Sequence, residues 1–454
     1  MTAALQRLVR ATISPYRLIA LAAAGLTLLV AVILRLAGAS PLPLLLAMAL
    51  IGVLWLALRY PVTGLGAFLI VMPEFTLLFL IAKFFGPGFI GSLEGIDRAV
   101  LFLLLAILIY KYRIKLKLPD YLILACFFLV AIRLPFDGSP LALVADFGFL
   151  LPYTAGRYVN LTDEQIIRWA RRAVWITAFL SVIGLIEVLF VGQGPRTLLY
   201  LSVAEKATSG DALNASFRAS GFTGMRASST MLGPLQFGPL CMVGLIVWWV
   251  FGENLILGLL IVAGLVSTLS RSAWLGAFLA IPLTSMLIGQ YTRFLRYLVI
   301  GSLAFVLALP FLGIGNFLTA TKSGEDVSAQ QHHDSLASGL QYIATHPMGG
   351  GSANMGRQAT KSNDNATYFE SMYLTFASEY GWLPLLLFLG FLASCIFLLW
   401  NSRTPLGITA VGIVFGFAGT LSVLSIHDVF PLACWVWFPV GLALQRAQPR
   451  QKVV

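Results

Sequence analysis

Long apolar stretches separated by short polar breaks recur from residue 16 to residue 446. A helix of about 20 apolar residues covers the roughly 30 Å hydrocarbon core of a bilayer, and the pattern predicts about 12 to 14 such spans. Their expected bounds are 16–36, 41–58, 62–84, 98–112, 119–134, 140–156, 172–192, 230–251, 254–270, 272–289, 296–314, 382–400, 405–424 and 430–446.

Some of these stretches contain residues that are unusual in a spanning helix. One is interrupted by Pro73 and Glu74, and others carry Asp146 and Glu187. Proline is tolerated because neighbouring helices can satisfy the backbone groups it frees. A carboxylate in the bilayer needs a partner, so Asp146 and Glu187 are expected to face the interior of the bundle.

Composition supports a membrane protein. Of 454 residues, 59% are hydrophobic and 11% charged, whereas about 25% of a soluble domain is charged. We therefore predict one all-α, polytopic integral-membrane domain over residues 1–454. Its first apolar stretch is expected to remain as a span, since no small-residue cleavage site follows it. The 4 cysteines lie in apolar stretches without CxxC spacing and are expected to be packing residues.

The polar breaks predict the orientation of the spans. The breaks rich in Lys and Arg, such as 111–117 and 168–172, are expected on the cytoplasmic side together with both termini. The net charge of +11 is attributed to these breaks, and no nucleic-acid partner is expected. The two long polar intervals, 193–229 and 315–381, then lie outside.

The inner breaks contain no motif for nucleotide chemistry. Neither a Walker motif nor a dinucleotide fingerprint is present, and no His/Cys spacing suits a metal. The segment 157–172 is expected to be an interfacial helix with Thr162 as N-cap and with Asp163 and Glu164 in its first turn. Chemistry is therefore expected on the outer side, without ATP.

Three arginines beside the outer breaks are candidates for binding an anion. Arg218 and Arg226 lie among Gly and Ser residues in 217–229, where two guanidinium groups could converge on one phosphate. They could equally be interfacial arginines that reach lipid headgroups. Arg271 interrupts a long apolar region, and an arginine placed there is costly unless it lies at a turn or has a partner.

The outer interval 315–381 contains the other candidates. A helix over 335–345 would place Leu336, Leu340 and Ile343 on one face, lying on the membrane. The glycines of 349–351 allow the backbone to approach a ligand closely. A second helix is expected over 368–380, ended by a glycine.

Glu370 lies near the start of that second helix. By itself it is explained as a solvated residue stabilised by the helix dipole. The histidines His332, His333 and His346 have no spaced third partner, so no metal site is expected.

Four local sequences resemble the O-antigen ligase and polymerase superfamily of bacterial inner-membrane proteins. They are RASGF at 218–222, SRSAWLGA at 270–277, HPMGGGSANMG at 346–356 and ESMYLTFASEYG at 370–381. Arg271 to Leu275 fits the Arg-x3-Leu pattern described for the ligases. The resemblance covers about residues 150–454 and implies a GT-C-like membrane glycosyltransferase with a large periplasmic loop between late spans.

One departure from the family pattern distinguishes this chain. The large loop of the ligases ends His-x10-Gly, whereas here Glu370 stands in the place of the histidine, followed by Gly381. Polymerase-like members often share this feature. The resemblance implies that Glu370 is the general base, and that Arg218 and Arg271 neutralise a departing diphosphate, with Arg226 as a further candidate.

The resemblance also implies the reaction and the partners. Donor and acceptor would be undecaprenyl-diphosphate-linked oligosaccharides, joined with inversion and without a metal or another cofactor, and a chain-length regulator or export machinery could assist. Candidate glycan or lipid contacts are Arg357, Tyr373 and His346, and His427 and Asp428 in the last outer turn could line the site.

Two alternatives stay open. The first is a ligase that transfers finished glycan to a lipid acceptor. The second is a lipid-linked oligosaccharide transporter or flippase, which would favour charges within the spans and duplicated halves.

Overall fold

The computed structural model describes residues 96–111, 114–191, 226–231, 233–252, 254–296, 298–299, 327–361 and 366–447, with single positions between 62 and 74. The predicted spans 16–36 and 41–58 lie outside these residues, as do most of 62–84, of 296–314 and of the interval 193–229. Arg218 is also outside them.

The described residues are almost entirely helical. An isolated bridge between Met355 and Thr367 is the one extended pairing among them. The elements are η1 (Met72–Glu74), α7 (Ile96–Lys111), α8 (Leu118–Ile132), α9 (Pro140–Asp146), α10 (Leu150–Tyr158), α11 (Asp163–Ile186), the π-helical η3 (Glu187–Val191), α14 (Pro234–Phe251), α15 (Leu255–Ser267), α16 (Arg271–Ile288), α19 (Val327–Thr345), η4 (Ala359–Lys361), α20 (Met372–Tyr380), α21 (Trp382–Trp400), α22 (Pro405–Leu421) and α23 (Phe430–Arg446).

The later apolar stretches form helices close to the predicted bounds, and two earlier predictions are corrected. Residues 140–156 do not form one continuous helix, because the chain leaves the helix between α9 and α10, which have 7 and 9 residues and are each too short to cross a bilayer alone. The break places Asp146 at a helix end, where polar partners reach it.

The segment 157–172 is not a separate interfacial helix. Its residues from Asp163 onward are the first turns of α11, which continues into the apolar stretch. The predicted N-cap is confirmed: the Thr162 side chain accepts a hydrogen bond from the Gln165 amide, and the Gln165 side chain accepts one from the Thr162 amide.

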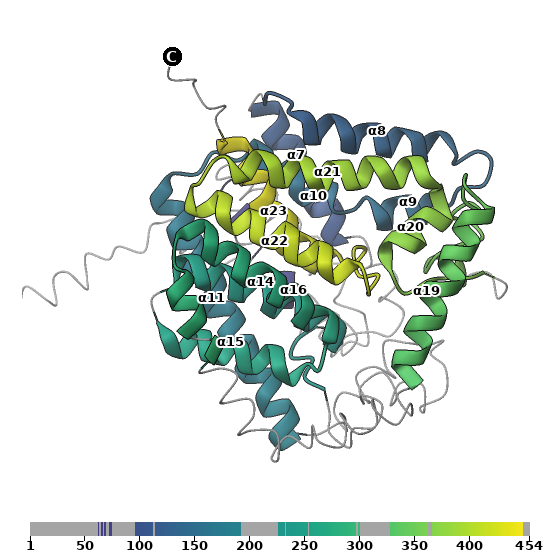
Figure 1. Cartoon of the computed structure of the whole chain (residues 1–454). Coiled ribbons are helices and arrows are strands. Elements are labelled where there is room, and N and C mark those ends of the chain that lie inside the picture. Colours follow the sequence, from purple (N-terminus) through teal and green to yellow (C-terminus); the bar gives the residue numbers. More distant parts are fainter. Residues whose placement is uncertain are drawn as a thin grey trace, which may run out of the picture.

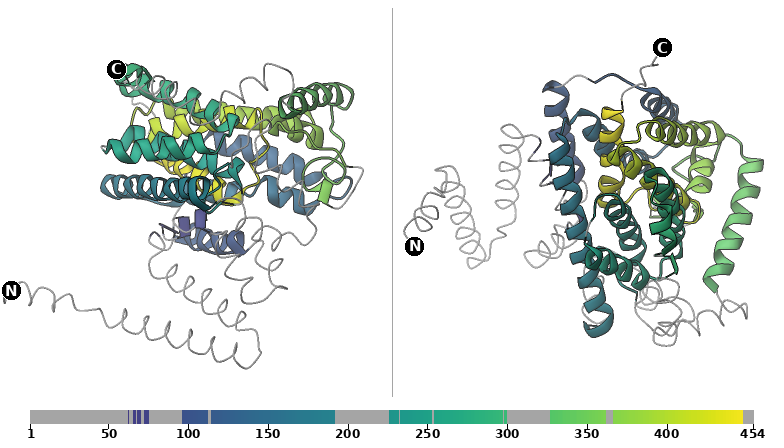
Figure 2. Two further views of the ribbon diagram at one scale, coloured as in Figure 1. Left: turned by 90° about the horizontal axis from the view of Figure 1, so that it is seen from below. Right: turned by 60° about the vertical axis from the view of Figure 1, so that its left-hand side comes forward.

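The helices α14 and α22 form the centre of the bundle. The first packs against α11, α15, α16, α22 and α23, and the second against α14, α16, α21 and α23. The helices α8 and α21 lie side by side along one edge, and α19 and α20 lie together at one end (Figure 1, Figure 2).

Glycines bring two helix pairs into backbone contact. A Cβ atom at Gly276 of α16 would lie 2.5 Å from the carbonyl oxygen of Gly416 of α22. On α10 and α23, a Cβ atom at Gly156 would lie 2.3 Å from the Phe438 carbonyl oxygen. Small residues at such crossings permit the close packing that holds membrane helices together.

Contacts divide the polar breaks between two ends of the bundle. At one end, the Lys117 ammonium donates to the carbonyls of Leu444 and Ala447, and Arg446 pairs with Asp163. These are the breaks predicted to be cytoplasmic. At the other end, Arg133 donates to the Tyr380 carbonyl, which joins two breaks predicted to be outside.

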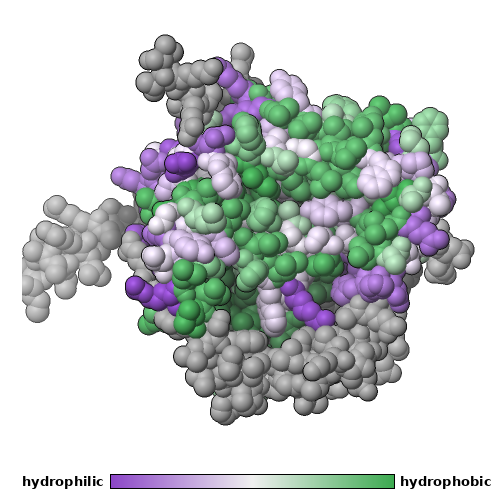
Figure 3. All heavy atoms as spheres, viewed as in Figure 1, coloured by the Kyte–Doolittle hydropathy of each residue, from purple (hydrophilic) through white to green (hydrophobic). Residues whose placement is uncertain are grey.

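Large apolar side chains cover the surface between these ends. Figure 3 shows hydrophobic residues over the middle of one face, with many hydrophilic residues toward its left and right edges. Six aromatic residues on five helices are between 60% and 68% exposed: Phe102, Phe128, Trp175, Phe179, Phe278 and Phe397.

Among the described helices, 4 are long and apolar enough to cross a membrane: Asp163–Val191, Pro234–Phe251, Arg271–Ile288 and Trp382–Trp400. An exposed apolar belt of this kind suits lipid and would cause a soluble protein to aggregate. The chain is a polytopic helical membrane protein.

Candidate active site

The C-terminal end of α22 brings the candidate residues to one place. The Thr420 hydroxyl donates to the Ser272 carbonyl at the start of α16, 3.2 Å away. The Tyr373 hydroxyl of α20 donates to the Ala418 carbonyl, 2.9 Å away. The turn that follows α22 carries His427 and Asp428. The start of α16 with Arg271, the start of α20 and this turn therefore surround one helix end.

Arg226 and Arg271 lie close together there. Burial lowers the pKa of Arg226 to about 10, and the positive charge of Arg271 contributes to that shift. The Arg226 guanidinium donates to the carbonyl of Thr268, 2.9 Å away, in the turn before α16. Arg271 is the first residue of α16, where the helix dipole is positive. Two guanidinium groups at a helix N-terminus form an environment suited to a phosphate group.

The buried carboxylate of Glu187 holds the segment that carries Arg226. Its Oε2 accepts hydrogen bonds from the backbone amides of Ser228 and Ser229, at 3.0 and 2.9 Å. Glu187 begins the π-helical turn that ends α11, a distortion often found near functional sites. The expectation that Glu187 faces the interior of the bundle is thereby met.

Glu370 lies between α19 and α20 and is partly exposed. One of its carboxylate oxygens contacts Nδ1 of His332, and 29% of its side-chain surface is accessible. Its backbone amide donates to the Ser335 hydroxyl, 3.0 Å away. The short helix begins at Met372, not at 368, so Glu370 precedes it. Gly381 ends this helix with a φ of +88°, as predicted.

The other predicted contact residues have different surroundings. Arg357 is half exposed and pairs with Asp428, with Nη1 3.4 Å from Oδ1. Burial raises the pKa of Tyr373, whose hydroxyl anchors α20 to α22. The ring of His346 stacks on Tyr342 with centroids 4.2 Å apart. His346 lies 14 residues beyond His332, about 21 Å along α19, so it is not grouped with Glu370.

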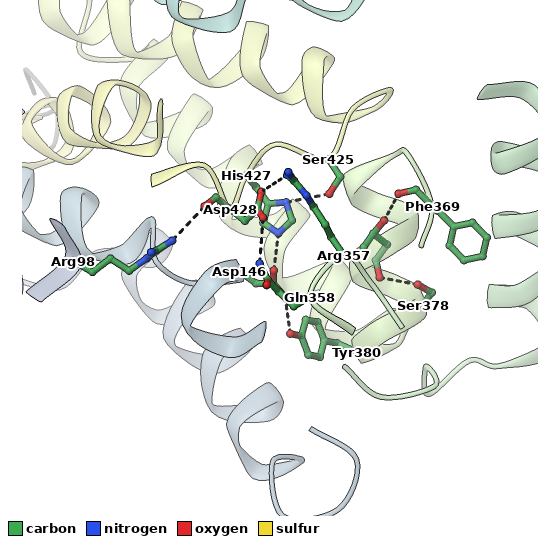
Figure 4. A network of polar contacts seen from close by, with 11 residues as sticks. Arg98, Asp146, Arg357, Gln358, Phe369, Ser378, Tyr380, Ser425, His427 and Asp428 are labelled. Carbon is green, nitrogen blue, oxygen red and sulfur yellow. Dashed lines mark hydrogen bonds and ion pairs between the residues drawn. The ribbon is translucent and has the colours of Figure 1, made fainter. Parts of the chain in front are cut away.

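A buried polar cluster lies beside the turn after α22 (Figure 4). Asp146 accepts from the Tyr380 hydroxyl at 2.6 Å and lies 3.0 Å from Nε2 of His427. His427 is followed by Asp428, which holds Arg357 and accepts from Arg98 of α7 through its carbonyl. The cluster thus joins α9, α20 and the turn.

Glu379 belongs to the same cluster. Burial and the neighbouring Asp146 carboxylate raise its pKa well above the usual range, which favours the protonated form. Burial would lower the pKa of His427, but its hydrogen bond to Asp146 and the charge of Asp146 outweigh that effect and raise it. The cluster therefore retains protons that isolated groups would release.

The glycine-rich loop packs over this cluster. The amides of Gly350 and Gly351 donate to the carbonyls of Ser378 and Glu379, at 2.7 and 3.1 Å. Gly356 has a φ of +91°, and a Cβ atom there would lie 1.5 Å from Oε1 of Glu379. The backbone of this loop thus lies against α20, and the expected approach of the glycines of 349–351 to a ligand stays a prediction.

Sequence reasoning did not bring Asp146, Glu379 and His427 together. The pattern predicts a buried carboxylate at Asp146 and a site-lining residue at His427, but it does not single out Glu379, which lies within ESMYLTFASEYG. The sequence feature that could have indicated this cluster is an acidic residue in each of two apolar segments, together with a histidine between two spans.

Elsewhere in the described residues, the structure offers less suitable surroundings for a catalytic site. A cavity of about 120 Å³ lies between α11, α14, α22 and α23 at the opposite end, and Arg172 is the one charged residue lining it. Within the described residues, no group of 3 or more His, Cys, Asp or Glu side chains is arranged to hold a metal ion.

The fold and site thus define a polytopic membrane protein with an arginine pair and a carboxylate at one end. Residues 256–389 match the family model described as O-antigen ligase. This region contains Arg271, Arg357 and Glu370. The match confirms the resemblance to the O-antigen ligase and polymerase superfamily and indicates a membrane enzyme of that type. No curated protein matches the chain.

Proposed function

We propose that this protein is a glycosyltransferase that polymerises lipid-diphosphate-linked repeat units into a cell-surface polysaccharide. The observation that supports the proposal is that two candidate segments contact the same end of α22: the start of α16, which carries Arg271 beside Arg226, and the start of α20, which follows Glu370. The donor is an undecaprenyl-diphosphate-linked oligosaccharide, and the acceptor is a sugar hydroxyl of a second lipid-linked chain.

Each group has one role in the proposed reaction. Arg226 and Arg271 bind the diphosphate and stabilise the charge that develops as it leaves, as cationic clamps do in other phosphate-leaving reactions. Arg218 is retained from the sequence motif as a third candidate. Glu370 removes the proton from the acceptor hydroxyl as that oxygen attacks the anomeric carbon. Attack opposite the leaving group inverts the anomeric centre. Arg357, whose charge, like that of Glu370, acts on Tyr368, contacts glycan.

The enzyme lies in the bacterial inner membrane with both termini in the cytoplasm and the candidate site toward the periplasm. This orientation agrees with the separation of the Lys- and Arg-rich breaks from the candidate site, because positively charged breaks favour the cytoplasmic side. A chain-length regulator or export machinery would act on the same face.

The ligase is the second candidate, because the matching family model carries that description. It differs in the acceptor: a ligase transfers the glycan once to a separate lipid acceptor and forms no longer polymer of repeat units. The glutamate in place of the ligase histidine favours the polymerase.

The decisive test replaces Glu370 with Gln, which preserves shape and removes the base. Full-length protein in lipid vesicles receives lipid-diphosphate-linked repeat units, and chain growth is followed on a gel. We expect a loss of about 10²- to 10⁴-fold in rate, with donor binding retained. Glu164→Gln, at an exposed residue of α11, is the matched control and should elongate normally. Equal rates in wild type and Glu370→Gln would contradict the base assignment.

A further inference from the structure

One face of α19 is built to hold Glu370. The Ser335 hydroxyl accepts a hydrogen bond from the Glu370 backbone amide, and His332, one turn earlier in the helix, contacts the Glu370 carboxylate. Gly339 continues this face: a Cβ atom there would lie 2.8 Å from the side chain of Leu374. Spacings of three and four residues place these positions on one side of a helix. Leu336 and Leu340 are 47% and 52% exposed on another side.

The two oxygens of Glu370 have different environments. Oε2 is buried against Nδ1 of His332, a contact between ionisable groups, and makes no hydrogen bond to the described residues. Oε1 makes no hydrogen bond to the described residues, and the side chain remains 29% exposed. One oxygen is therefore buried against His332, while no described residue forms a hydrogen bond to the other.

The surroundings of this pair are charged. Burial raises the pKa of the neighbouring Tyr368, and Glu370 adds to that rise, while Arg357 opposes it and Asp428 adds to it. Glu370 thus shares its surroundings with the Arg357–Asp428 pair at the turn after α22. An acceptor that reached Glu370 would meet these side chains as well.

We propose that His332 is a positioning residue, which fixes Oε2 of Glu370 and so presents Oε1 to the acceptor hydroxyl. This inference rests on the proposed function and adds a second residue to its base. In the balanced step, the acceptor oxygen bonds to the anomeric carbon while the bond from that carbon to the diphosphate oxygen breaks. The leaving diphosphate keeps that electron pair, and the hydroxyl proton passes to Oε1. His332 contacts none of the reacting atoms.

The test compares three variants of the full-length protein in the elongation assay, with kcat and KM measured between pH 5 and 8. His332→Ala removes the contact. His332→Asn retains a hydrogen-bond donor near the position of Nδ1 and lacks the second ring nitrogen. His333→Ala is the matched control, because His333 is the next residue of α19 and its side chain is 81% exposed.

We expect His332→Ala to lower kcat by about 10- to 100-fold with an unchanged KM, since a misplaced catalytic group costs rate on this scale. His332→Asn should recover to within about 5-fold of wild type for the same reason. The pH profile should retain an acidic limb in both variants, because the base is still Glu370. His333→Ala should match wild type.

Three results would overturn the inference. A wild-type rate in His332→Ala would make the contact irrelevant to turnover. If His332→Asn were as slow as His332→Ala and its pH profile had lost the acidic limb, the imidazole itself would be the base. Either result, with Glu370→Gln inactive, leaves the proposed function standing. Failure of wild type to transfer glycan to any acceptor would overturn the proposed function and this inference together.

Discussion

Among the described residues, the buried ionisable group around Asp120 and the one around Asp146 lie near opposite ends of the bundle and differ in their balance of charge. At the end predicted to be cytoplasmic, Arg157 pairs with Asp120 at 2.8 Å. Asp120 also accepts from the Tyr153 hydroxyl and the Lys117 amide, both at 2.7 Å. One cation thus meets one anion whose oxygens are both hydrogen-bonded, which is the arrangement expected of a structural ion pair.

The group at the opposite end has a surplus of acid. Asp146 pairs with the imidazole of His427, whereas Glu379 lies against the Asp146 carboxylate. Oε2 of Glu379 is buried without a hydrogen-bond partner among the described residues. Buried polar atoms are usually satisfied, so an exception of this kind suggests a functional role. The comparison indicates that the Asp120–Arg157 group stabilises the fold. The group of Asp146, Glu379 and His427 retains protons and also anchors the turn that carries Asp428, beside the candidate active site.

The largest effect on stability is expected from breaking the first group. Asp120→Ala would leave the Arg157 charge buried without its partner, a change that costs about 3–5 kcal/mol. Chemical unfolding in mixed micelles measures it. Asp163→Ala is the control at the same end, because its side chain is 83% exposed and surface pairs contribute about 1 kcal/mol or less. Similar losses in the two variants would contradict the distinction.

A pH-dependent effect is expected from the second group. The raised pKa of Glu379 means that the folded protein keeps a proton which the unfolded chain releases above about pH 4.5. Stability from this group is therefore fully present below that pH and is lost as pH rises toward the folded-state pKa, by at most about 1.4 kcal/mol per pH unit.

Glu379→Gln removes this titration, so its stability relative to wild type should increase with pH above about 4.5. Thermal unfolding from pH 4.5 to 8 measures the two slopes. His427, whose pKa is also raised, contributes a slope of the same sign in both proteins. Parallel curves would show that Glu379 ionises normally in the folded state.

The smallest effect on stability is expected from breaking the ion pair between Arg357 and Asp428. Arg357 is 47% exposed in its pair with Asp428, so Arg357→Gln should change the free energy of unfolding by less than about 1 kcal/mol. If Arg357 contacts glycan, KM should rise while the fold persists. An unchanged KM would limit Arg357 to holding the turn.

Local pattern predicted most of the described helices. The apolar stretches 382–400 and 430–446 fold with the predicted bounds as α21 and α23. Arg271 begins α16 within a residue of the predicted start. These features depend on the length of an apolar stretch and on the polar residues that interrupt it, both of which are local. Gly381 likewise ends α20 because its positive φ favours glycine.

Tertiary packing decided the rest. The pattern did not reveal the break after Asp146, because the residues around it are as apolar as those of a span. Asp146, Glu379 and His427 come from three segments, and their contact follows from how α9, α20 and the turn after α22 pack together. The sequence by itself determined a helical membrane protein with its arginines and Glu370 in polar breaks. The tertiary structure decided which of those residues meet and which carboxyl groups are buried together, because both depend on contacts between segments distant in the chain.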